Sequence, residues 1–185
     1  MNIAFILAGG IGQRTGQDVP KQFICVNNKP VFVYTLENFQ KCPAIDEICV
    51  ACSAGWEIVV STYAKQFNIT KLKTIVTGGK NRFMSIYNLL KAPNEYNADD
   101  IILVYDAVRP IITDEIIDDG ISKAKQYGAA VGVMPCYDTM FGVQKQDDSV
   151  LTVRQNRDLI YRGMGPDVVP YGRLLNIFEK YIAVD

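Results

Sequence analysis

Short apolar segments alternate along this chain with stretches in which apolar residues recur at helical spacing. Each apolar segment is four to seven residues long. Most are apolar on both faces, as is typical of strands that helices cover on both sides. The pattern predicts five strands: Ile3–Leu7, Glu47–Cys52, Lys73–Val76, Ile101–Tyr105 and Ala129–Pro135.

The stretches between and after these strands carry apolar residues three and four positions apart, which predicts amphipathic helices. Thr113 is a candidate helix start and Gly128 a candidate helix stop. The helices are expected within residues 31–41, 56–67, 83–90, 116–124 and 171–181.

Strand–helix–strand alternation at this spacing indicates an α/β fold with a mostly parallel sheet and right-handed crossovers. In such sheets ligands bind beyond the carboxyl ends of the strands. After Pro135 the pattern changes, because two short β-like runs flank a polar turn. Residues 136–157 are therefore expected to form a hairpin arm that projects from the sheet.

Composition narrows the function classes. The chain has 185 residues, of which 49% are hydrophobic and 21% charged, as in one globular domain spanning residues 1–185. A net charge of −1 argues against nucleic acid as a partner. The absence of histidine excludes Ser-His nucleophiles and His-ligated zinc. No apolar stretch is long enough for a membrane span.

The cysteines and the N-terminus point to the cytoplasm. Five cysteines, an odd number, suggest reduced thiols. The pair Cys49 and Cys52 lies within a predicted strand and has no second pair to complete a metal site, so we interpret it as strand packing. The apolar N-terminus lacks a preceding basic region and is soon interrupted by glycines, which favours a first strand over a signal peptide.

The loop after the first strand has the composition of a phosphate-binding turn. Gly9, Gly10 and Gly12 leave backbone N–H groups free to approach a ligand oxygen. Arg14 and Lys21 supply cations that can pair with phosphate. The spacing matches neither a Walker loop nor a dinucleotide fingerprint.

Two later loops follow predicted strands at the same edge. Gly78 and Gly79 open the third loop, and Asn81 is a candidate cap for the following helix. Asp106 directly follows the fourth strand, at a position where a hard cation such as Mg²⁺ could bind together with substrate phosphates. A structural ion pair between Asp106 and Arg109 is the alternative, and the two are compatible.

Taken together, five elements in this order resemble the cytidylyltransferases that act on polyol phosphates. The resemblance extends from residue 1 to about residue 162. The elements are Ala8-Gly9-Gly10-x-Gly12-x-Arg14, Pro20-Lys21-Gln22, Gly78-Gly79-x-x-Arg82-x-x-Ser85, Asp106-Ala107-Val108-Arg109-Pro110 and Asp138-Thr139.

The resemblance implies a Rossmann-like nucleotidyltransferase domain that uses CTP and Mg²⁺, with a β-arm that embraces a second subunit in a homodimer. The polyol phosphate would attack the α-phosphorus of CTP and release pyrophosphate. Its acceptor would be 2-C-methyl-D-erythritol 4-phosphate, in isoprenoid biosynthesis, or D-ribitol 5-phosphate, in teichoic-acid biosynthesis. Val108 and residues 157–163 lean towards the ribitol branch, while the wide need for isoprenoid precursors favours the other.

The resemblance also assigns roles to individual residues. Ala8, Gly9, Gly10 and Gly12 would surround CTP, with Gly79 and Ser85 against its base and ribose. Arg14 and Lys21 would stabilise the transferring phosphorus, and Asp106 would hold the metal. Arg109 would steady that loop, and Thr139 and Arg157 on the arm would hold the polyol phosphate in the partner's site.

Two departures from the family pattern stand out. Met164-Gly165-Pro166-Asp167 replaces a Gln-Thr-Pro-Gln element, and Lys80 stands where an acidic residue is frequent. We find no match for the family within 163–185, nor its Asn-x-Lys strand, so the C-terminal part is expected to be truncated or divergent.

Three other functions stay open. A relative that binds CTP without turnover would fit the missing C-terminal lysine. A sugar-nucleotide pyrophosphorylase would share the first loop but not the Asp-Ala-x-Arg-Pro element. An NAD-dependent oxidoreductase is disfavoured because Thr15 stands where the dinucleotide pattern needs glycine.

Overall fold

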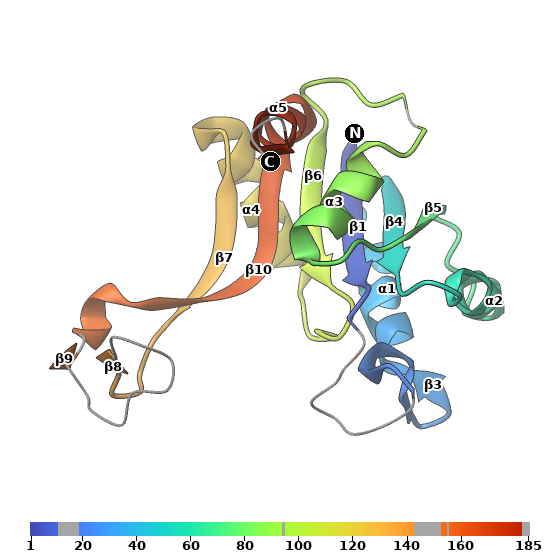
Figure 1. Cartoon of the computed structure of the whole chain (residues 1–185), viewed down its shortest axis with the longest axis horizontal. Coiled ribbons are helices and arrows are strands. Elements are labelled where there is room, and N and C mark those ends of the chain that lie inside the picture. Colours follow the sequence, from blue (N-terminus) through green and yellow to red (C-terminus); the bar gives the residue numbers. More distant parts are fainter. Residues whose placement is uncertain (11–18, 94, 143–152, 155, 183–185) are drawn as a thin grey trace.

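The computed structural model describes residues 1–10, 19–93, 95–142, 153–154 and 156–182. Its centre is a six-stranded sheet with strand order β5-β4-β1-β6-β10-β7 (Figure 1). The strands are β1 (Asn2–Ala8), β4 (Glu47–Cys52), β5 (Leu72–Thr77), β6 (Ile101–Asp106), β7 (Ala130–Pro135) and β10 (Tyr161–Pro170).

The sheet is mostly parallel, as predicted. Strand β1 pairs in parallel with β4 and β6, and β4 pairs in parallel with β5. Strand β10 runs antiparallel to both of its neighbours, β6 and β7. The five predicted strands are all present, with ends within one residue of the prediction.

Strand β10 is absent from the prediction, although it lies between two strands that were expected. Gly163, Gly165 and Pro166 interrupt its apolar pattern, and the pairing with β7 shifts register between Gly163 and Asp167. Glycine and proline inside a strand usually mark a bulge, so local pattern argues against a strand here. Only the pairing partners on both sides define it.

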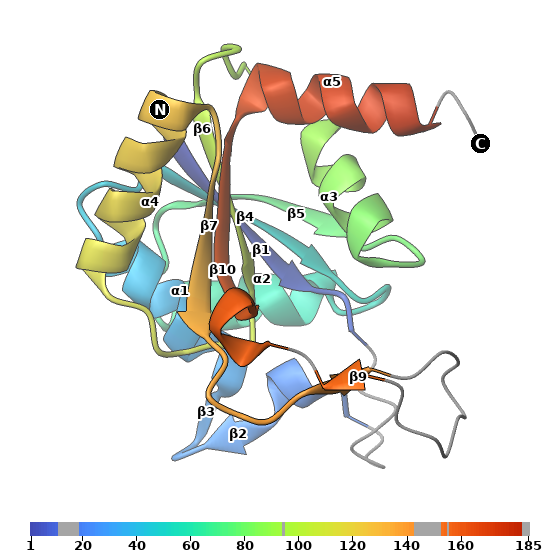
Figure 2. The ribbon, with the colours of Figure 1, turned by 90° about the vertical axis from the view of Figure 1, so that its left-hand side faces the viewer.

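In the described part of the chain, five α-helices cover the two faces of the sheet (Figure 2). Helices α1 (Val31–Lys41), α2 (Glu57–Gln66) and α4 (Asp114–Tyr127) pack on one face, and α3 (Arg82–Leu90) and α5 (Tyr171–Ile182) pack on the other. All five helices were predicted. The predicted stop is also confirmed, because Gly128 adopts the left-handed conformation (φ 84°) that favours glycine and ends α4.

Strand β1 contributes side chains to the hydrophobic cores on both faces of the sheet. Ala4, Ile6 and Ala8 belong to the core under α1, α2 and α4, while Ile3 and Phe5 belong to the core under α3 and α5. Side chains two residues apart share a face of a strand, which explains why this segment is apolar throughout.

The two cysteines of the C-x-x-C pair are strand residues, as interpreted. Cys49 and Cys52 lie in β4, both buried, and they belong to the cores on opposite faces of the sheet. Burial raises the pKa of the Cys52 thiol to about 11 and also raises that of Cys49. The thiols are therefore packed side chains rather than reactive nucleophiles.

Beyond Pro135, β7 and β10 lead into the predicted arm, which projects from the body (Figure 1). Within the arm, β8 (Phe141–Gly142) pairs antiparallel with β9 (Val153–Arg154), as expected of two strands of a hairpin. A 3-10 helix, η3 (Arg157–Leu159), leads back into β10. The central part of the expected hairpin lies outside the described residues.

A second small feature stands near the carboxyl end of β1. The 3-10 helix η2 (Lys21–Phe23) is followed by the antiparallel pair β2 (Cys25–Val26) and β3 (Lys29–Pro30). None of the helices in the described part of the chain is long and apolar enough to cross a membrane.

Candidate active site

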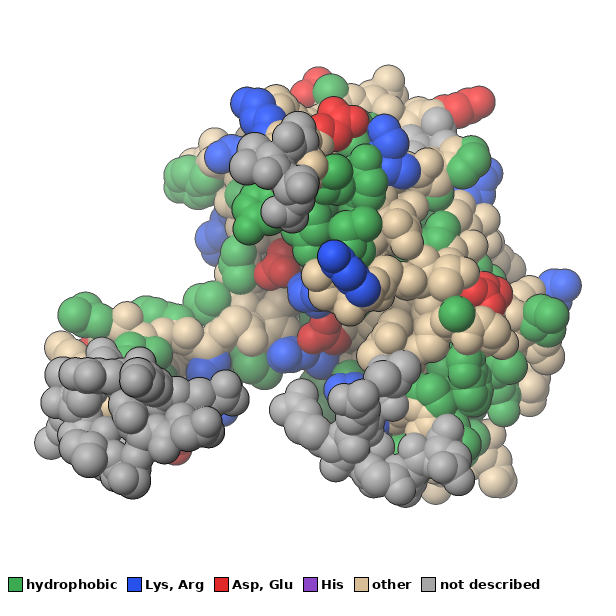
Figure 3. Space-filling model, viewed as in Figure 1, with side chains coloured by type: hydrophobic (Ala, Val, Ile, Leu, Met, Phe, Trp, Pro, Cys, Tyr) green, Lys and Arg blue, Asp and Glu red, His purple; other side chains and the backbone are tan. Residues whose placement is uncertain are grey.

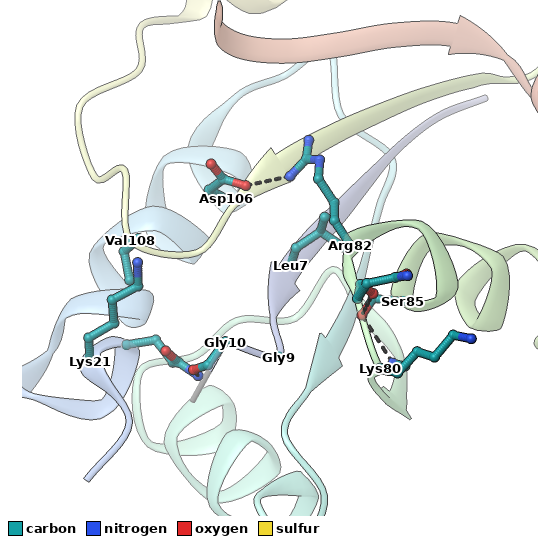
Figure 4. A pocket seen from close by; sticks show the side chains of 12 residues that line it. Leu7, Gly9, Gly10, Lys21, Lys80, Arg82, Ser85, Asp106 and Val108 are labelled. Atoms are coloured by element: carbon teal, nitrogen blue, oxygen red, sulfur yellow. Dashed lines mark hydrogen bonds and ion pairs between the residues drawn. The ribbon is translucent and has the colours of Figure 1, made fainter. Parts of the chain in front are cut away.

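A cavity of about 370 Å³ opens at the carboxyl edge of the sheet (Figure 4). Its walls come from the ends of β1 and β6, from η2, and from the turn that leads into α3. This is the edge where parallel α/β sheets bind ligands, and the volume suits a small molecule. The lining residues are Leu7, Gly9, Gly10, Lys21, Gln22, Gly79, Lys80, Asn81, Arg82, Ser85, Asp106 and Val108.

The first wall is the start of the glycine loop, held in place by Gln22. The Gln22 side chain is buried, and its Nε2 donates hydrogen bonds to the carbonyl oxygens of Ala8 (2.5 Å) and Gly10 (2.9 Å). Gly9 and Gly10 line the cavity as predicted, whereas Ala8 is buried behind it. Gly12 and Arg14, two further predicted residues, lie outside the described part of the chain.

Sequence reasoning gave Gln22 no role of its own, although it belongs to the Pro-Lys-Gln element. One side chain ties two carbonyls of the loop to the 3-10 helix that carries Lys21. A glutamine has two N–H donors on one nitrogen, which is what this arrangement needs.

We expect Gln22→Glu to weaken by about tenfold the binding of CTP, the ligand that the sequence resemblance implies, because the carboxylate cannot donate and would face two carbonyl oxygens. Titration calorimetry with CTP measures the binding, and thermal unfolding should show a lower Tm. Gln66→Glu, the same change at the exposed end of α2, is the matched control and should leave both quantities unchanged. Equal CTP affinity in the Gln22 and Gln66 variants would contradict the role given to Gln22.

The second wall is the turn between β5 and α3, which brings Gly79 and Ser85 together. The backbone N–H of Gly79 donates to Ser85 Oγ (3.0 Å), and Ser85 Oγ donates to the carbonyl of Asn81 (2.9 Å). The Asn81 side chain accepts from the N–H of Met84 (2.8 Å), so the predicted helix cap is confirmed. A Cβ on Gly79 would collide with Met84, so the turn requires glycine there.

A charge cluster forms the third wall, around the end of β6. Asp106 Oδ1 pairs with Arg82 Nη1 (2.5 Å), and Asp106 Oδ2 pairs with Arg109 Nε (2.9 Å). Arg82 Nη2 also pairs with Asp167 on β10 (2.9 Å). The Asp106–Arg109 ion pair that sequence offered as an alternative is thus present. Arg109 does not line the cavity, because its Nη1 turns to the carbonyl of Met164 (3.1 Å).

Cations outnumber anions on the walls of this cavity. Among the described lining residues, Lys21, Lys80 and Arg82 face a single carboxylate, Asp106. In the view of Figure 4, Lys21 and Lys80 lie on opposite sides of Gly9 and Gly10. A surplus of cations around backbone N–H groups favours a polyanionic ligand such as a triphosphate.

Thr139 and Arg157 lie on the arm and outside this cavity. Both side chains are exposed, and Arg157 Nη1 donates to the carbonyl of Tyr137 within the arm (3.0 Å). On the face shown in Figure 3, acidic and basic side chains gather in the hollow between the arm and the body. The fold of a single chain therefore does not join these two predicted residues to the cavity.

The fold and the cavity define a class: α/β proteins that bind a phosphorylated ligand at the carboxyl edge of a mostly parallel sheet. A family model described as IspD, 2-C-methyl-D-erythritol 4-phosphate cytidylyltransferase, matches residues 2–183. The chain therefore belongs to this cytidylyltransferase family. The match reaches residue 183, so the expectation that the resemblance ends near residue 162 is wrong.

Individual relatives agree with the family match. Ribitol-5-phosphate cytidylyltransferase of Lacticaseibacillus paracasei is 33% identical over 184 residues, which is 99% of this chain and 78% of that protein. 2-C-methyl-D-erythritol 4-phosphate cytidylyltransferase of Clostridium botulinum strain Langeland is 37% identical over 180 residues, 97% of this chain and 76% of that protein.

A solved structure confirms the fold. The crystal structure of Francisella tularensis 2-C-methyl-D-erythritol 4-phosphate cytidylyltransferase superposes with a TM-score of 0.79 at 28% identity. The match covers 99% of this chain and 78% of that structure. The tail after the arm, where the sequence led us to expect no family match, forms β10 and α5, and both the family model and the structural match extend over it.

Proposed function

We propose that this protein transfers CMP from CTP to the phosphate of a polyol phosphate and releases pyrophosphate. The observation that carries the proposal is the cavity itself, in which a glycine loop, Lys21 and Asp106 meet at the carboxyl edge of the sheet. In the reaction a phosphate oxygen of the acceptor forms a bond to the α-phosphorus of CTP. The bond between that phosphorus and the oxygen that links it to the β-phosphorus breaks, and this oxygen leaves as part of pyrophosphate.

Charge accumulates on the phosphoryl oxygens during this transfer, so catalysis depends on position and on cations. Lys21 would stabilise that charge, and the N–H groups of Gly9 and Gly10 would contact phosphate oxygens. Gly79 and Ser85 would receive the nucleoside, with Ser85 also fixing the turn. Arg14 would add a further cation.

The residues also fit a divalent cation. Asp106 lines the cavity with a partly exposed carboxylate, and Mg²⁺ commonly binds through one or two carboxylates and substrate phosphates. Both Asp106 oxygens now pair with arginines, so a cation would have to displace one of them. When bound, Mg²⁺ would neutralise charge on the triphosphate.

The arm supports a homodimer. Thr139 and Arg157 would contact the acceptor phosphate only if a second copy brings its arm over the cavity. Large apolar side chains are exposed along the arm and its supporting strands, which is typical of a covered surface. They are Val131, Val133, Tyr137, Met140, Phe141, Leu159 and Tyr161. We also place the protein in the cytoplasm, in keeping with five free cysteines.

Pyrophosphate release tests the proposed reaction. Purified protein with Mg²⁺ is assayed with each of the four nucleoside triphosphates, and with 2-C-methyl-D-erythritol 4-phosphate or D-ribitol 5-phosphate as acceptor. We expect release with CTP and one acceptor, and that acceptor assigns the branch. Release with ATP, UTP or GTP instead of CTP would overturn the proposal in favour of another pyrophosphorylase.

A second candidate is a family member that binds CTP without turnover. The observation that favours it is the engagement of both Asp106 oxygens by Arg82 and Arg109. CTP binding by calorimetry, with no pyrophosphate release from either acceptor, would support it.

A further inference from the structure

Asp167 is a carboxylate beside the active site to which the family resemblance assigns no role. In the β10–β6 pairing Asp167 lies opposite Val104, and Asp106 follows Val104 by two residues. Residues two apart share a face of a strand, so Asp167 and Asp106 are diagonal neighbours on one face of the sheet. Only the insertion of β10 next to β6 brings them together.

One guanidinium joins the two carboxylates. Arg82 donates from Nη1 to Asp106 (2.5 Å) and from Nη2 to Asp167 (2.9 Å). Arg82 and Asp106 line the cavity and Asp167 does not, so Asp167 reaches the site through Arg82 (Figure 4 shows the Arg82–Asp106 pair).

The two arginines on Asp106 differ in what they can do when a cation arrives. Arg109 is three residues from Asp106, and its second partner is the uncharged carbonyl oxygen of Met164 on β10. Arg82 reaches over from α3 and has a second carboxylate partner. If Arg82 left Asp106, the ion pair with Asp167 would still hold its guanidinium beside the cavity.

We propose that Asp167 is a positioning residue for Arg82. It holds the Arg82 guanidinium when Asp106 binds the cation that accompanies the nucleotide. Asp167 therefore lowers the cation concentration that CTP binding requires. This inference rests on the proposed function, which places Mg²⁺ on Asp106. Without the Asp167 charge, Asp106 is the one acidic partner left to Arg82 among the described residues, so Arg82 competes more strongly with the cation.

The test is the Mg²⁺ dependence of CTP binding, measured by calorimetry without any acceptor. Because the ion pairs are partly exposed, we expect Asp167→Asn to raise the half-saturating Mg²⁺ concentration by about threefold to tenfold. CTP affinity at saturating Mg²⁺ should change by less than about twofold. The matched control is Asp99→Asn, the same charge change at an exposed site beyond the amino end of β6, which should have no effect.

A double-mutant cycle with Arg82→Gln separates positioning from direct ligation. If Asp167 acts through Arg82, Asp167→Asn has a clearly smaller effect on the Mg²⁺ requirement in the Arg82→Gln background. An equal or larger effect there would mean that Asp167 attracts or binds the cation itself, and would overturn the inference. Circular dichroism on each variant checks that the fold is retained.

Two further outcomes distinguish a failure of this inference from a failure of the proposed function. A wild-type protein that needs Mg²⁺ and an Asp167→Asn variant with the same requirement would overturn the inference and leave the proposed function standing. CTP binding that is independent of Mg²⁺ in the wild-type protein would overturn the proposed metal role, and this inference with it.

Discussion

Replacing Lys21 with alanine is expected to lower kcat by about 10²–10³-fold, while CTP binding weakens far less, because a cation aimed at the transferring phosphoryl group contributes mainly in the transition state. Lys21 begins η2 and lines the cavity next to the glycine loop, and the buried Gln22 that follows it fixes that helix to the loop. The measurement is pyrophosphate release at saturating CTP, Mg²⁺ and acceptor.

Two comparisons make this expectation specific. Lys21→Arg keeps the charge and should retain more activity than Lys21→Ala, although a planar guanidinium does not replace an ammonium group fully. Lys65→Ala removes the same charge from an exposed position on α2 and should behave like the wild type. If Lys21→Ala keeps kcat within about threefold of the wild-type value, Lys21 is a binding residue at most and its catalytic role is wrong.

Mixing two inactive variants is expected to restore activity if the arm completes the site of a partner subunit. Lys21→Ala alters the cavity of its own chain. In the proposed dimer, Arg157→Ala alters the arm that would reach the partner's cavity. In a mixed dimer one site carries both damaged residues and the other carries neither. Random pairing should therefore return about a quarter of wild-type activity, since half of the dimers are mixed and half of their sites are intact.

The control for this experiment is a Lys21→Ala chain mixed with the Lys21→Ala/Arg157→Ala double variant, which has no intact site in any pairing. It should stay inactive. If the two single variants also stay inactive after subunit exchange, or if Arg157→Ala alone is fully active, the arm does not act across a dimer. The exposed position of Arg157, away from the cavity of its own chain, is the reason to expect complementation.

Much of the fold follows from local pattern. The segments around β1, β4 and β6 are apolar on both faces because helices cover both sides of the sheet, so their length and composition alone identify them. The end of α4 at Gly128 and the N-terminal cap of α3 at Asn81 could also be predicted. Each depends on the conformational or hydrogen-bonding capacity of one residue.

The candidate site was readable only in part. Gly9 and Gly10 follow β1, and Asp106 ends β6, so the rule for parallel sheets brings them to one edge. Lys21 begins η2, in the connection that follows the glycine loop. Gln22 was visible as part of a motif, yet its two hydrogen bonds depend on where the loop folds back.

By itself the sequence determined the α/β class, the mostly parallel sheet, the glycine loop and the arm. These features depend on hydrophobic periodicity, turn residues and strand–helix alternation, which can be recognised over short stretches of the chain. The tertiary structure decided the rest. Strand β10 exists only because β6 and β7 pair with its glycine- and proline-interrupted backbone. That pairing places Asp167 close to Asp106, and Arg82 bonds to both carboxylates. Because the three residues are far apart in the sequence, no local pattern predicts this cluster.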